Sequence, residues 1–144
     1  MLVKIYLDID GVILTHDHKI PEYGEEFVSY LISHHEVFWL TTHCRGGVNG
    51  AIKYLSQFYS GTTLDKLKQV IQTDWKDLKT EAIDFDSGFI WLDDYPFESE
   101  KRVLNKYNRI NALIVVDLKR GEENVEDHAL PPNNRFDSTA LPDL

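Results

Sequence analysis

Two pairs of acidic residues, far apart in the chain, are the side chains best suited to chemistry. Asp8 and Asp10 follow an apolar segment at residues 2–7, and Asp93 and Asp94 follow a second apolar segment. Because side chains alternate along a strand, Asp8 and Asp10 point the same way, with Cα atoms roughly 6–7 Å apart. Like charges at the end of a buried strand indicate a hard divalent cation, with one carboxylate left for covalent or acid–base chemistry.

Each pair also has a simpler interpretation. Residues 8–11 read Asp-Ile-Asp-Gly, a sequence that is common in turns and in calcium-binding loops. A calcium loop needs further oxygen ligands at fixed steps, and the apolar residues 12–14 interrupt that spacing. Asp93 and Asp94 could instead cap a helix, since Pro96 and a helical pattern follow them. The presence of both pairs favours a shared site.

The elements that must position these acids alternate between strand and helix patterns. Continuous apolar strands separated by helices predict a parallel sheet covered on both faces, in a Rossmann-like α/β fold. In such sheets ligands bind beyond the carboxyl ends of the strands, where Thr41 and Thr42 are also expected. The expected strands are 2–7, 36–40, 70–72, 88–92 and 112–116, about five in all and mainly parallel, and the expected helices are 21–34, 48–58, 64–68, 75–83 and 98–107.

The connections predict one three-layer domain over residues 1–144 with no large cap. Residues 12–19 are expected to form a short flap, whose His16 and His18 either face solvent or touch a substrate. Residues 119–144 are acidic, polar and proline-rich, and are expected to form a tail beyond a core of about 118 residues.

The composition narrows the classes of function. The formal net charge is −9, which disfavours non-specific nucleic-acid binding without excluding nucleic-acid ends, because a bound cation would reverse the local sign. A single cysteine, Cys44, and the lack of a signal-peptide pattern or a long apolar stretch predict a cytoplasmic protein with no membrane segment. The sequence does not indicate an oligomeric state.

Four motifs, in order along about the first hundred residues, resemble those of the haloacid dehalogenase (HAD) superfamily of phosphohydrolases. They are Asp-x-Asp-Gly-Val at residues 8–12, a strand ending in Thr41, Lys79 near the start of a later helix, and a strand ending in the acidic pair at residues 93–94. Larger members carry a cap domain that this chain has no room for. The resemblance therefore implies a capless member with an open site, suited to a large or macromolecular substrate or covered by a partner subunit.

The resemblance also implies catalytic roles. Asp8 would be the nucleophile that becomes an aspartyl phosphate, and Asp10 would be the general acid and base. Thr41 would hydrogen-bond the transferring phosphoryl group, while Lys79 would hold the charge of Asp8 and of the phosphoryl oxygens. Lys76 competes with Lys79 for that assignment.

The metal implied by the resemblance is Mg²⁺. Asp8, Asp93 and the backbone carbonyl of Asp10 would ligate it, and Asp94 would complete the shell directly or through water. Among residues that could bind substrate, Thr42 is the alternative to Thr41.

Arg45 lies just past Thr41, near the expected mouth of the site. It could grip a distal anionic group of the substrate, because the arginine fork suits phosphate.

These observations predict a Mg²⁺-dependent phosphatase that acts on a phosphate monoester through an aspartyl-phosphate intermediate. Two alternatives stay open. A phospho-receiver or sensor domain would accept phosphate at the end of the third strand, where Asp74 lies. A catalytically silent binding domain would retain the fold but have a decayed catalytic site. Within enzymes, a nucleic-acid end phosphatase is a further alternative, and the substrate and pathway are not indicated.

Overall fold

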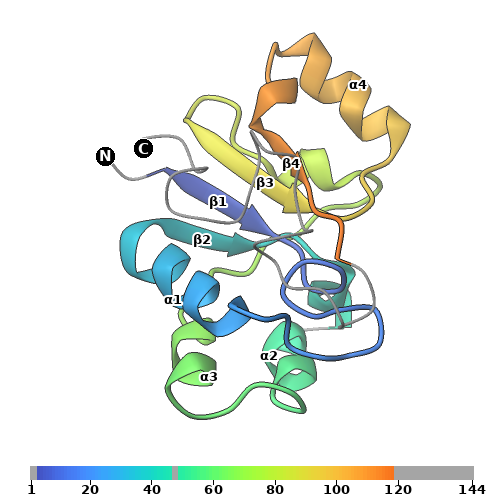
Figure 1. Cartoon of the computed structure of the whole chain (residues 1–144). Coiled ribbons are helices and arrows are strands. Elements are labelled where there is room, and N and C mark those ends of the chain that lie inside the picture. The colour runs from blue at the N-terminus through green and yellow to red at the C-terminus, as the bar shows by residue number, and fades with distance from the viewer. Residues whose placement is uncertain (1–2, 47–48, 119–144) are drawn as a thin grey trace.

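A four-stranded parallel sheet forms the centre of the computed structural model, which describes residues 3–46 and 49–118, without the side chains of residues 45 and 46. The strand order is β2-β1-β3-β4 (Figure 1). The strands are β1 (Lys4–Leu7), β2 (Glu36–Trp39), β3 (Phe89–Asp93) and β4 (Leu113–Val115). From β1 the chain first adds β2 on one side and later adds β3 on the other. The strand order therefore reverses between β1 and β3, which makes this the topological switch point where open α/β sheets bind ligands.

Helices cover both faces of the sheet. Helices α1, α2 and α3 lie on one side and α4 on the other (Figure 1). The helices are α1 (Gly24–His34), α2 (Gly50–Leu55), α3 (Gly61–Leu67) and α4 (Glu98–Lys106), with short 3₁₀ helices η1 (Thr42–Gly46), η2 (Lys79–Ala82) and η3 (Ile110–Ala112). The predicted α/β class and parallel pairing are confirmed, and the arrangement is consistent with a Rossmann-like fold. No helix among the described residues is both long enough and apolar enough to cross a bilayer.

Side-chain alternation divides the core into two layers. Ile5 and Leu7 of β1 pack with the α1–α3 layer, whereas Tyr6 between them packs with Trp91 and Leu104 on the α4 side. This two-residue period is the consequence of extended backbone geometry. All five of these side chains are at most 2% exposed, so the register of each strand is fixed by the layer that each residue must enter.

The same alternation determines where the acids point. Tyr6 pairs with Trp91, and the next hydrogen bond along the ladder runs from the Asp8 amide to the Leu92 carbonyl, at 3.1 Å. Continuing the register by two residues from the Tyr6–Trp91 pair places Asp8 beside Asp93, and both share the α4 side of the sheet with Tyr6 and Trp91. Two carboxylates thus lie on neighbouring strands, whose usual spacing is about 4.8 Å.

The described residues contain four strands rather than the expected five. The segment expected at 70–72 pairs only through Ile71, which forms an isolated parallel bridge with Phe38 beside β2. Ile71 donates to the Val37 carbonyl at 2.9 Å and accepts from the Trp39 amide at 2.8 Å. Ile71 is 44% exposed, so this edge lacks the apolar burial that would extend it into a strand.

The expected helix at 75–83 is also shorter than its pattern suggested, since only η2 is helical there. The backbone amides of residues 76, 77 and 78 instead donate to the carboxylate of Glu81. The Glu81 carboxylate therefore satisfies amide groups that a longer helix would otherwise have bonded, and the chain before η2 follows an irregular path.

The hairpin flap expected at residues 12–19 is not confirmed, because this described segment contains no strand and only Leu14 pairs, through an isolated bridge to Asp10. Val12, Ile13 and Leu14 are at most 1% exposed, because their apolar side chains enter the core. The hydroxyl group of Tyr59 donates to the Ile13 carbonyl at 2.7 Å and anchors this segment. Only the polar part at residues 16–19 reaches the surface. The tail expected at 119–144 lies outside the described residues.

Gly11 allows the β1 loop to approach the acidic pair after β3. Its φ is +81°, and an added Cβ would lie 2.7 Å from the Cβ of Asp94. Gly61 has a similar φ of +59°, but an added Cβ there would meet nothing within 4 Å. Substitutions at the two glycines can therefore distinguish the cost of backbone strain from the cost of a steric clash.

We expect Gly61→Ala to lower the free energy of unfolding by about 1–2 kcal/mol, the cost of a left-handed conformation. Gly11→Ala adds overpacking, which is typically about 1–3 kcal/mol more. Urea unfolding of both variants measures the difference. Equal losses would contradict the close contact between this loop and Asp94.

Candidate active site

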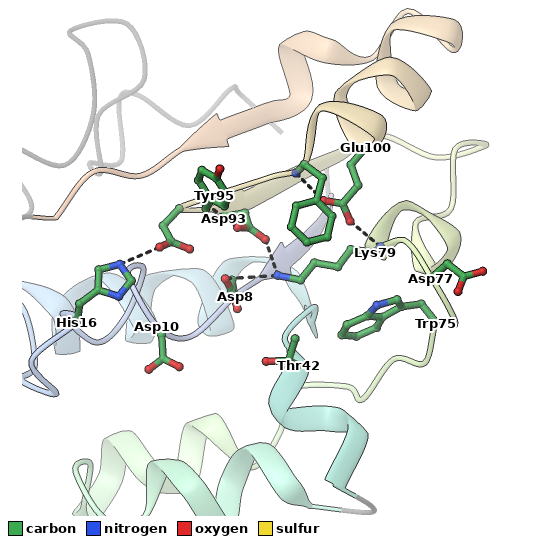
Figure 2. Close-up of a pocket in the computed structure, with 12 residues that line it drawn as sticks. Asp8, Asp10, His16, Thr42, Trp75, Asp77, Lys79, Asp93, Tyr95 and Glu100 are labelled. Atoms are coloured by element: carbon green, nitrogen blue, oxygen red, sulfur yellow. Dashed lines mark hydrogen bonds and ion pairs between the residues drawn. The ribbon is translucent and has the colours of Figure 1, made fainter.

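Three carboxylates converge at the switch point between β1 and β3. Asp8 directly follows β1, and Asp93 is the last residue of β3 (Figure 2). Asp94 is the next residue along the chain. One oxygen from each lies within 4.8 Å of the others, and Asp8 and Asp93 are 8% and 1% exposed. The structure thus brings together three of the four predicted metal-binding acids by their side chains.

Lys79 of η2 supplies a cation to this cluster. Its Nζ lies 2.7 Å from Oδ2 of Asp93 and 3.4 Å from Oδ2 of Asp8 (Figure 2). Burial would lower the pKa of Lys79, but Asp8 and Asp93 outweigh it and raise that pKa, so the ammonium stays charged. Lys76 is exposed and does not line the site. Of the two candidate lysines, Lys79 is the one beside the acids.

The cluster carries more negative than positive charge. Burial, followed by the neighbouring Asp93 carboxylate, raises the pKa of Asp8 to about 8, although Lys79 opposes this. Burial and Asp93 also raise the pKa of Asp94. A divalent cation among these oxygens would favour the charged forms. The donor set fits Mg²⁺, which takes one or two carboxylates and completes its octahedron with water and phosphate oxygens.

Glu100 of α4 holds the backbone of Lys79 in place. This carboxylate is 2% exposed, and its Oε2 accepts a hydrogen bond of 2.7 Å from the Lys79 amide. Its other oxygen accepts from the Phe97 amide at 2.8 Å, so the carboxylate at the third helical position of α4 reaches back to the N-cap backbone. One buried side chain therefore links the start of η2 to the start of α4.

Asp10 is turned away from the cluster. Figure 2 shows its carboxylate pointing away from the Lys79–Asp8 pair. Its Oδ2 lies 2.8 Å from Nε2 of His43, and its Oδ1 accepts a 2.8 Å hydrogen bond from the Tyr54 hydroxyl. The His43 and Tyr54 rings are stacked with centroids 3.8 Å apart. Asp10 therefore has its own partners, contributed by η1 and α2.

Thr42, rather than Thr41, reaches the site. Thr41 is 1% exposed, and its Oγ1 accepts from the His43 amide at 3.3 Å. Thr42 lines the same cavity as Asp8 (Figure 2). The backbone of Arg45 lies in η1, but its side chain is outside the described part of the chain.

The two histidines of the β1 loop have different surroundings. Nε2 of His16 lies 2.8 Å from Oδ2 of Asp94, with the His16 side chain 60% exposed (Figure 2). His18 stacks on Phe58, with ring centroids 5.6 Å apart. His16 thus belongs to the rim of the acidic site, whereas His18 packs against the turn that follows α2.

A cavity of about 340 Å³ opens over the cluster. Besides the acids, Lys79, His16 and Thr42, its wall includes three aromatic residues, Trp75, Tyr95 and Phe97. The cavity thus combines a charged floor with aromatic sides.

Several of these residues were not indicated by sequence reasoning. Glu100 had one available signal, its position three residues after Phe97 at a helix start. Tyr54 and the aromatic wall had none, because their roles depend on how loops distant in sequence pack together.

Comparisons of the chain with protein-family models, curated proteins and solved structures found no match. The site geometry and the motifs that resemble those of the HAD superfamily are therefore the features that bear on function.

Glu100→Gln tests the link between η2 and α4. Glutamine offers only one acceptor oxygen, so either the Lys79 or the Phe97 amide loses its part-buried hydrogen bond, and we expect a loss of about 1–3 kcal/mol in unfolding free energy. Glu81 is exposed and also accepts from backbone amides, so Glu81→Gln is the matched control with a smaller loss. Urea unfolding of both variants makes the comparison. A Glu100→Gln variant as stable as Glu81→Gln would show that the buried link is unimportant.

Proposed function

We propose that this protein is a Mg²⁺-dependent phosphohydrolase of HAD-like type, which cleaves phosphate monoesters through an aspartyl phosphate on Asp8. The observation that carries the proposal is the convergence of Asp8, Asp93, Asp94 and Lys79 at the switch point of the sheet. These residues come from three of the four motifs that suggested the resemblance.

In the first step, a carboxylate oxygen of Asp8 attacks the phosphorus atom, and the bond between phosphorus and the ester oxygen breaks. Two unit charges 4 Å apart repel by about 4 kcal/mol at an effective dielectric of 20. Lys79 offsets part of this repulsion, because its Nζ lies within 3.4 Å of the Asp8 carboxylate. A bound Mg²⁺ would supply further charge neutralisation for the phosphoryl oxygens.

Asp10 is assigned the proton transfers. In its acid form it gives a proton to the leaving alkoxide. In the second step it accepts a proton from the water that attacks phosphorus, and the phosphorus–oxygen bond to Asp8 breaks to release inorganic phosphate. Asp10 lines the cavity, and both of its oxygens contact His43 and Tyr54, so in this role it would exchange one of these contacts for the ester oxygen. Thr42 is better placed than Thr41 to hydrogen-bond a phosphoryl oxygen.

The geometry favours this function over a phospho-receiver. The receiver candidate, Asp74, is exposed and is not part of the cavity wall, whereas Asp8 is buried beside Lys79. The phosphate acceptor is therefore assigned to Asp8. The site residues that this function requires are also present, which disfavours a silent binding domain.

The deciding experiment compares Asp8→Asn with Asp74→Asn. With p-nitrophenyl phosphate and Mg²⁺, we expect Asp8→Asn to lower kcat by at least about a thousandfold, because the nucleophile is lost. Asp74→Asn should retain wild-type turnover, and acid trapping should find phosphate on the Asp74→Asn protein but not on the Asp8→Asn protein. The opposite pattern would support the receiver interpretation.

Removal of the metal should have a separate signature. EDTA should abolish turnover and excess Mg²⁺ should restore it. Asp94→Asn should raise the Mg²⁺ concentration for half-maximal activity by about tenfold or more, since a charged oxygen donor is lost. Calorimetric titration of Mg²⁺ into the Asp94→Asn protein measures the same loss without turnover. Unchanged Mg²⁺ affinity would remove Asp94 from the metal site.

A further inference from the structure

Two aromatic side chains of the cavity wall are largely exposed to solvent. Tyr95 and Phe97 are 77% and 54% exposed, although large apolar side chains are normally covered. Both line the same cavity as Asp8 and Lys79. Trp75 completes the wall and packs partly against both core clusters, so its ring has a fixed position.

The aromatic residues are tied to the groups assigned to phosphate chemistry. The Tyr95 amide donates to Oδ1 of Asp93 at 2.9 Å, while Oδ2 of Asp93 binds Lys79. Glu100 accepts from the amides of both Phe97 and Lys79. The backbone at Tyr95 and Phe97 is thereby held at a set position relative to the phosphoryl site.

We propose that the substrate is a phosphate monoester that carries a planar ring, and that Trp75, Tyr95 and Phe97 contact this ring; the proposal rests on the phosphohydrolase function above. A cavity of about 340 Å³ lies in the usual range for small-molecule sites and exceeds what a phosphate group alone would need. Planar rings stack on aromatic side chains through their faces, so the wall would hold the ring while the charged floor holds the phosphate.

The charge of the cavity restricts the rest of the substrate. Among the described residues, six carboxylates, one lysine and one histidine line it. Lys79 and the magnesium ion of the proposed function can compensate one phosphoryl group. Among the described residues of the lining the basic side chains are Lys79 and His16, and His16 already lies against Asp94. A second anionic group would therefore face carboxylates such as Asp77 toward the rim (Figure 2). The preferred substrate therefore carries one phosphate and a neutral ring, as in a nucleoside monophosphate or an arylalkyl phosphate.

Two matched substrate pairs test the requirement for a ring. The first compares adenosine 5′-monophosphate with methyl ribofuranoside 5-phosphate, which lacks the base. The second compares benzyl phosphate with cyclohexylmethyl phosphate, whose ring is saturated and whose leaving alcohol is similar. We expect kcat/KM to favour the planar member of at least one pair by about fivefold or more. The pair with the larger preference identifies a nucleoside or an aryl source, and adenosine diphosphate should be a poorer substrate than the monophosphate.

Substitutions in the aromatic wall test whether its rings cause the preference for the planar substrate. Tyr95→Leu and Phe97→Leu keep apolar bulk but remove the ring, and should reduce the preference toward one. Tyr95→Phe should retain it. Tyr107→Leu is the control, because Tyr107 is another exposed aromatic residue, at 50%, that does not line the cavity.

Failure of this inference can be distinguished from failure of the proposed function. Equal kcat/KM within both pairs, with both members hydrolysed, would overturn the ring proposal and leave the phosphohydrolase intact. Calorimetric binding to the Asp8→Asn protein with Mg²⁺ gives a readout without turnover. Tighter binding of the planar members there would support the inference, and equal binding would overturn it.

Discussion

The pairing of one buried ammonium with converging carboxylates is the constraint on which the site depends. Asp8 and Asp93 leave the sheet on adjacent strands, so their charges are brought together by the backbone itself. Removal of one member of a buried charge pair typically costs about 3–5 kcal/mol, because the remaining charge keeps its desolvation penalty. Lys79 therefore has a structural role in any state of the site, and chemistry at Asp8 would use the same electrostatic field.

The rest of the scaffold keeps this pairing in register. The two apolar layers fix which residues of β1 and β3 face α4, and the acids follow from that alternation. Glu100 fixes the backbone of Lys79 from the opposite direction, through the start of α4. Gly11 permits the loop after β1 to close against Asp94. Strands, a helix start and a loop thus hold the ion cluster, and a different interaction fixes the position of each.

Sequence reasoning found the parts of this site that depend on strand periodicity. Asp8 and Asp93 could be placed because apolar runs end at them, and parallel strands bring such ends to one edge. The choice between Lys79 and Lys76 required knowing on which side η2 approaches the sheet. The choice between Thr41 and Thr42 likewise depends on how the chain turns into η1, where one hydroxyl is buried and the other faces the cavity. Such one-residue differences depend on tertiary packing rather than on pattern.

The position of Asp10 outside the acidic cluster avoids further repulsion between carboxylates. A fourth carboxylate directed into the cluster would add repulsion to groups that already exceed the charge of Lys79. Instead, His43 and Tyr54 contact its two oxygens. Burial and the hydrogen bond to Asp10 raise the pKa of Tyr54 to about 12, so this hydroxyl group remains a donor near neutral pH. These partners belong to η1 and α2. Residues outside the acidic cluster therefore hold a carboxylate that the cluster itself would repel. An incoming phosphate ester would offer Asp10 a new partner over the cavity, so proton transfer would be coupled to substrate binding.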